Sequence, residues 1–160
     1  MREMILKCIE KNSKVDIKEL AVLLGVDEIT VANEIAAMEK ENIICGYHTM
    51  IDWDKTSEEK VTEMIEVRVA PQMGQGFDKM AERICKYSEV NSVYLISGAF
   101  DLMVTIEGKS LKEVSSFVTN KLSTLQGVLS TATNFILKKY KDHGIIMEAE
   151  PEDERMLVIP

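Results

Sequence analysis

Between Val61 and Leu137 the sequence alternates stretches of strand character with stretches of helix character, and this order constrains the fold more than any other feature. β-Branched and apolar residues at alternate positions predict strands at residues 61–69, 90–96, 102–106 and 128–137. Two intervening stretches have helical spacing, with predicted inward residues Phe77, Met80, Ala81 and Ile84, then Leu111, Val114, Phe117, Val118 and Leu122. The order β-α-β-β-α-β predicts a ferredoxin-like sandwich with both helices on one face of an antiparallel sheet.

Short signals mark the ends of these elements. Pro71 is expected to end the first strand, and Gly74 and Gly76 to open the helix that follows. Ser110 with Glu113 predicts a capping box at the start of the second helix.

The sheet face without helices is expected to be covered. Apolar residues recur at alternate strand positions, which suggests apolar groups on both sides of the sheet: Ile65, Val67, Val69, Tyr94, Ile96, Phe135 and Leu137. An open sheet of this kind usually buries its bare face against a second copy, so we expect a homodimer.

Three short helices are predicted ahead of the sheet. The first occupies residues 4–12; Asp16 caps the second, which ends at Gly25. Asp27 caps the third, which ends at Asn42, a residue that tolerates positive φ. The β-prone stretch that follows, broken at Gly46, predicts a strand pair, and the ordered set describes a winged helix-turn-helix.

The chain is therefore predicted to be an α+β protein in four parts: a winged helix-turn-helix at 1–52, a linker at 53–60, a ferredoxin-like domain at 61–141 and an acidic extension at 142–160. The apolar end at 156–159 is expected to be either an added edge strand or a frayed tail.

Composition excludes several classes. The chain has 160 residues, and its 19 basic and 27 acidic residues give a net charge of −8. Three cysteines without CxxC spacing predict neither a zinc site nor disulfides, and no cofactor is indicated. Neither a signal peptide nor a stretch long enough to cross a membrane is evident, so a cytoplasmic location is expected.

Four motifs in this order resemble the Lrp/AsnC family of transcription factors. They are Ile17-Lys-Glu-Leu-Ala21 with Gly25-Val26, Ile44-Cys-Gly-Tyr47, Gly98-Ala-Phe-Asp-Leu102 and Lys138-Lys-Tyr-Lys141. The resemblance implies a DNA-binding regulator with a RAM-type C-terminal domain that binds a small effector, typically an amino acid. It also implies a homodimer, often assembled into tetramers or octamers.

The family's effector-binding turn corresponds to residues 98–101 of this chain: Gly98, Ala99, Phe100 and Asp101. Gly98 would let backbone N–H groups approach an α-carboxylate, and Asp101 could pair with an α-ammonium group. The alternative is a tight hairpin turn whose aspartate bonds to the backbone. Thr131 and Thr133 correspond to polar positions that contact the effector in the family, although ordinary strand residues would look the same.

The third predicted helix departs from the family, whose members commonly carry several arginines there. Residues 27–41 contain five acidic residues and one lysine. Thr30 and Asn33 are the predicted base contacts, with Asn33 directed at adenine; Glu34 could accept from cytosine but would repel phosphate. The predicted phosphate contacts are Lys14, Lys18 and, on the wing, His48. A solvated helix face and a plain surface histidine are the alternatives.

Two other functions compete with DNA-binding regulation. The acidic third helix favours an oligomeric effector sensor that has lost DNA binding and acts on a protein partner. The layout also resembles sirohaem decarboxylases, but the chain offers two histidines, few arginines and no catalytic set, so we expect no enzyme activity and no metal site.

Overall fold

The computed structural model describes residues 1–70 and 76–147. The chain divides into two compact units, the first at Met1–Ile51 and the second beginning at Asp52. Pro71, Gly74 and most of the predicted acidic extension, including its apolar end, lie outside the described residues.

The first unit contains three helices, α1 (Arg2–Lys11), α2 (Ile17–Leu24) and α3 (Glu28–Lys40), as predicted. The side chain of Asp16 accepts a hydrogen bond from the N–H of Lys18, which caps α2. Gly25 ends α2 in the left-handed conformation, with φ 68°. The helices close over a small core made of Ile5, Leu20, Ala21, Val31 and Met38.

The predicted wing is wrong. Residues 43–51 form no strand, and in this stretch only Ile44 and Met50 are partly buried. A two-stranded ribbon is marginal unless it packs on a third element, and the stretch makes little contact with the core of its unit beyond Ile44. Strand propensity alone therefore does not produce a hairpin at this place.

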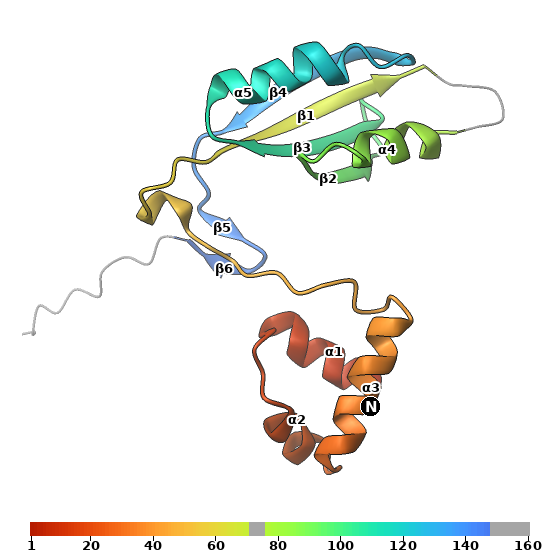
Figure 1. Cartoon of the computed structure of the whole chain (residues 1–160), viewed down its shortest axis with the longest axis vertical. Helices are drawn as coiled ribbons and strands as arrows, with labels where there is room; N and C mark the ends of the chain where they lie inside the picture. Colours follow the sequence, from red (N-terminus) through yellow and green to blue (C-terminus); the bar gives the residue numbers. More distant parts are fainter. Residues whose placement is uncertain (71–75, 148–160) are drawn as a thin grey trace, which may run out of the picture. The chain divides into compact units, whose positions relative to one another are not determined.

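The second unit confirms the ferredoxin-like order. All pairings in its four-stranded sheet are antiparallel, and the strand order is β2-β3-β1-β4 (Figure 1). Its main elements are β1 (Val61–Val69), α4 (Asp78–Cys85), β2 (Val90–Leu95), β3 (Leu102–Gly108), α5 (Leu111–Phe117) with the π-helical turn η2 (Val118–Leu122), and β4 (Val128–Ile136).

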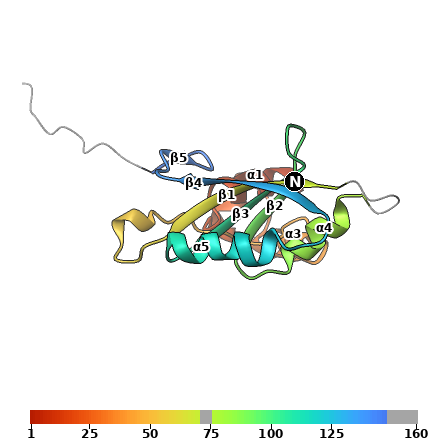
Figure 2. The same ribbon diagram turned by 90° about the horizontal axis from the view of Figure 1, so that it is seen from above.

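Helices α4 and α5 lie on the same side of the sheet (Figure 2). They cover a core that includes Ile65 and Val67 of β1 and Val104 of β3. Leu111 was expected in this core but is 57% exposed. It occupies the first position of α5, where the chain enters the helix at the surface.

The expectation of two apolar faces is only partly met. Ile65, Val67 and Val69 lie under the helices, and Phe135 shares that side because it pairs with Glu63. On the open side the register places a mixture of polar and apolar residues: Thr62, Met64, Glu66, Arg68, Ser92, Tyr94, Met103, Thr105, Glu107, Ser130, Ala132, Asn134 and Ile136. This face is therefore amphipathic, with Tyr94 58% exposed.

A short appendage completes the described part of the second unit. It comprises the 3-10 turn η1 (Trp53–Lys55) and the hairpin of β5 (Lys141–Asp142) and β6 (Ile145–Ile146). Lys55 Nζ donates to the carbonyl oxygen of Met147 at 3.3 Å, which ties the turn to the end of the hairpin.

Candidate functional site

Helix α3 presents an uncharged stripe to solvent over its first two turns. Ile29, Asn33 and Ala36 follow the i, i+4, i+7 spacing of one helix face and are all exposed, Ile29 to 72%. Val31 and Met38 are buried on the opposite side. Asn33 therefore lies on the face of α3 that an incoming ligand can reach.

Thr30 takes part in the cap of this helix. Its N–H donates to Asp27 Oδ1 at 2.8 Å, and its hydroxyl donates to Asp27 Oδ2 at 2.6 Å. These bonds hold the pKa of Asp27 below its usual value. The hydroxyl proton of Thr30 is thus used within the helix, which leaves only the oxygen lone pairs for a further partner.

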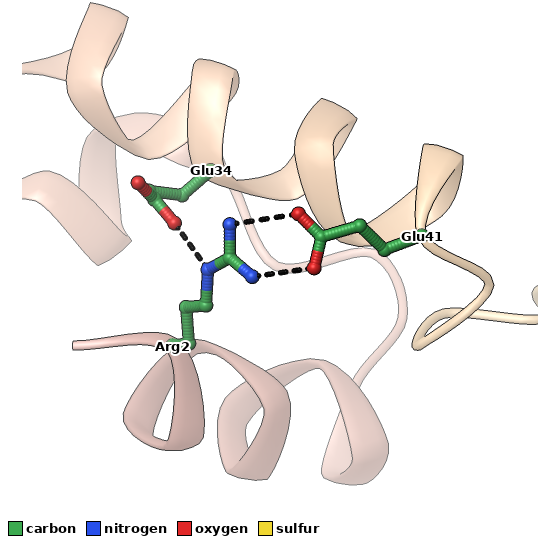
Figure 3. Close-up of polar contacts among 3 residues, drawn as sticks. All are labelled: Arg2, Glu34 and Glu41. Atoms are coloured by element: carbon green, nitrogen blue, oxygen red, sulfur yellow. Dashed lines mark hydrogen bonds and ion pairs between the residues drawn. The ribbon is translucent and has the colours of Figure 1, made fainter.

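Two glutamates of the first unit are held by one arginine (Figure 3). Arg2 Nε donates to Glu34 Oε2 at 2.6 Å, and Nη1 and Nη2 donate to Glu41 at 2.7 and 3.1 Å. The guanidinium lowers the pKa of Glu41, and the two carboxylates raise the pKa of Arg2. Glu34 is therefore directed at α1. Nothing in the sequence around Arg2 predicts this role.

The predicted phosphate contacts are exposed but lie on different segments. Lys14 is in the turn between α1 and α2, and Lys18 is in the first turn of α2. His48 is exposed on the stretch that forms no wing. For these three side chains the described part of the structure shows no ion pair.

The turn at residues 98–101 is fastened to β1. The N–H of Asp101 donates to the carbonyl of Val67 at 3.0 Å, and Asp101 Oδ2 accepts from the N–H of Val69 at 2.8 Å. Arg68 Nη2 donates to the carbonyl of Ala99 at 2.7 Å, and its guanidinium lies 5.4 Å from the ring centroid of Phe100. One carboxylate oxygen of Asp101 is thus already engaged in a hydrogen bond that holds the turn to β1. Sequence reasoning missed Arg68, which has no neighbouring motif.

Gly98 has an ordinary φ, and a Cβ added to it would meet no atom of the described residues within 4 Å. Among residues 1–70 and 76–147, neither backbone strain nor packing requires glycine at this position.

Thr131 and Thr133 lie across β1 from this turn. Thr131 pairs with Val67 and Thr133 with Ile65, so both threonines point to the helix side of the sheet. Thr131 Oγ1 lies 3.5 Å from Ser123 Oγ at the end of η2. The sheet therefore does not place either threonine beside Asp101.

Among residues 1–70 and 76–147, no group of three or more His, Cys, Asp or Glu is arranged to hold a metal ion. No helix in the described ranges is long and apolar enough to span a membrane.

Comparison with known proteins agrees with the fold. Residues 62–146 match the family model of the Lrp/AsnC ligand binding domain. The chain is 47% identical over 157 residues to the uncharacterized HTH-type transcriptional regulator YugG of Bacillus subtilis, covering 98% of this chain and 95% of that protein. It is 27% identical over 139 residues to the HTH-type transcriptional regulator LrpA of Pyrococcus abyssi, covering 87% and 96%.

A solved structure has the same fold. The transcriptional regulator NMB0573 of Neisseria meningitidis, in complex with L-Met, matches with a TM-score of 0.68 and 20% identity over 86% of this chain and 88% of that one. The curated relatives are regulators and not enzymes, which opposes the decarboxylase alternative. From its second-unit fold, its family match and its near full-length relatives, this chain belongs to the Lrp/AsnC family of HTH-type transcriptional regulators.

Proposed function

We propose that the chain binds specific DNA sites through α3 and regulates transcription in response to a small effector. The observation that carries this proposal is the exposed, uncharged stripe around Asn33 on a capped α3. In the proposal Asn33 contacts adenine and the oxygen of Thr30 accepts from a base edge, while Lys14, Lys18 and His48 contact phosphates. Glu34 has no base contact, because Arg2 holds its carboxylate. Action on chromosomal DNA would place the protein in the cytoplasm.

The proposed effector is an amino acid bound at the turn of residues 98–101. The Neisseria regulator was solved with L-Met, which supports this chemical class. The open space at Gly98 suits a carboxylate that approaches backbone N–H groups. Asp101 has one carboxylate oxygen that is not used by Val69 and could pair with an ammonium group. Thr131 and Thr133 remain weaker candidates, since β1 separates them from the turn.

The proposed assembly is a homodimer through the open sheet face, with tetramers or octamers built from it. The exposed Tyr94 beside Met103 supplies apolar area on that face. Its polar neighbours suit an interface that is amphipathic, as many interfaces between folded subunits are.

A mobility-shift assay at low salt with the gene's own upstream region tests DNA binding, and a thermal-shift screen of the twenty amino acids tests the effector. We expect retardation of the fragment and stabilisation by at least one amino acid. The second candidate, a sensor that lost DNA binding, is favoured by the five acidic residues of 27–41. Stabilisation by an amino acid without retardation of any genomic fragment would support the sensor and contradict the first proposal.

A further inference from the structure

The acidic residues near α3 oppose an approach to phosphates, yet most of them have partners inside the unit. Asp27 is hydrogen bonded to the start of its own helix, and Glu39 accepts from the hydroxyl of Tyr47 at 2.8 Å. Glu34 and Glu41 share a single cation on α1. At these two glutamates, therefore, a residue of another helix, Arg2 of α1, partly neutralises the negative charge near α3.

The geometry of this contact is that of a clamp. Glu34 and Glu41 are seven residues apart, so they lie on the same side of α3, about two turns from each other. The guanidinium of Arg2 bridges them, with one hydrogen bond to Glu34 and a bidentate pair of hydrogen bonds to Glu41. This side differs from the one that carries Asn33, since the carboxylates face α1 (Figure 3).

We infer that Arg2 is a positioning residue for DNA binding: it turns Glu34 and Glu41 toward α1 and reduces their joint charge from −2 to −1. The inference rests on the proposed function and deepens it. An unpaired glutamate beside the stripe would be free to swing toward the phosphates and repel them. The first turn of α1 thus supplies the cation that pairs with Glu34 and Glu41.

The test uses the full chain and a fluorescent duplex from its own upstream region, with binding followed by anisotropy over a salt series. We expect Arg2→Gln to weaken binding about tenfold at low salt, and the deficit to shrink as salt rises, because screening removes repulsion. The triple variant Arg2→Gln/Glu34→Gln/Glu41→Gln should bind at least as tightly as the unmodified chain, since it lacks both the cation and the acids. Arg83→Gln, with the same charge change on α4, serves as the matched control and should bind normally.

If the contacts of Arg2 only stabilise the fold, the DNA affinities of the variants should follow a different pattern. In that case the triple variant, which has lost every ion pair of the clamp, stays as weak as Arg2→Gln, and the deficit is equal at all salt concentrations. Either result, or normal binding by Arg2→Gln, overturns the inference while DNA binding stands. If Arg2→Gln fails to fold, Glu34→Gln/Glu41→Gln decides: tighter binding supports the inference and unchanged binding contradicts it. No binding by the unmodified chain contradicts the proposed function itself.

Discussion

Arg2 and Glu34 lie 32 residues apart in the sequence, and an ion pair of 2.6 Å between Nε and Oε2 joins α1 to α3. The contact links the first turn of α1 to α3, the helix proposed to contact bases. An arginine outside α3 therefore pairs with Glu34 on that helix and with Glu41 directly after it.

Arg2→Gln is expected to change thermal stability by only a few degrees. The side chains of Arg2, Glu34 and Glu41 are 39%, 30% and 49% exposed, and ion pairs in contact with water contribute little to folding. Circular dichroism melting of the variant and of Arg83→Gln checks this. Loss of the helical signal at room temperature in Arg2→Gln alone would show that the clamp is required for folding.

Glu63 makes stability depend on pH. It is fully buried on β1, and within the described residues neither carboxylate oxygen has a hydrogen-bond partner. Burial raises the pKa of Glu63 above its ordinary value of 4.5, so the folded state holds the proton more tightly than the unfolded state. This contribution is fully present below about pH 4.5 and is lost as pH rises through the raised pKa.

Glu63→Leu is therefore expected to raise the free energy of unfolding at neutral pH by about 1–3 kcal/mol, because a buried polar group without partners is removed. Urea titrations from acid to neutral pH, with Glu63→Gln as the non-titrating control, measure it. Parallel pH profiles for the unmodified chain and Glu63→Gln would contradict this account.

Gly25→Ala should destabilise the first unit by about 1 kcal/mol, because an alanine at this left-handed position is strained. The φ of Gly25 is 68°. Gly46→Ala is the control, since Gly46 has an ordinary φ and open space around it. Equal unfolding midpoints for the two variants would show that the helix end is not constrained as described.

Gly98→Ala separates binding from folding. Because a Cβ at Gly98 meets no atom within 4 Å in the part of the chain that the structure describes, the melting temperature without ligand should not change. If an amino acid carboxylate approaches this backbone, its stabilising effect in a thermal-shift screen should be lost or strongly reduced. An unchanged ligand response in Gly98→Ala would place the effector elsewhere.

Much of the fold could be predicted because its signals are local. Asp16, Asp27 and Gly25 mark helix ends through bonds and dihedral angles that involve neighbours in sequence. The capping signal at Ser110 also holds, although Glu113 Oε2 accepts from the N–H of Lys109, one residue before the predicted partner.

The missed features depend on distant partners. Residues 43–51 have β propensity but form no strand; their contacts with the helices include the packing of Ile44 and the hydrogen bond from Tyr47 to Glu39, and neither supplies a backbone partner for a strand. The side on which Phe135 lies follows from its pairing with Glu63 of β1, which alternation within β4 cannot show. Arg2 and Arg68 act on elements 32 and 31 residues away, so their roles depend on the folded topology.

The most direct test of the account is the affinity of the full chain for its upstream fragment, measured with and without the amino acid that most raises its melting temperature. Coupling between the two sites predicts a change in affinity of roughly 5- to 150-fold. Asp101→Asn, which keeps an oxygen for the N–H of Val69 but removes the charge, should bind DNA normally and abolish the change. Identical DNA affinity with and without saturating amino acid would contradict the claim that the chain is an effector-responsive regulator.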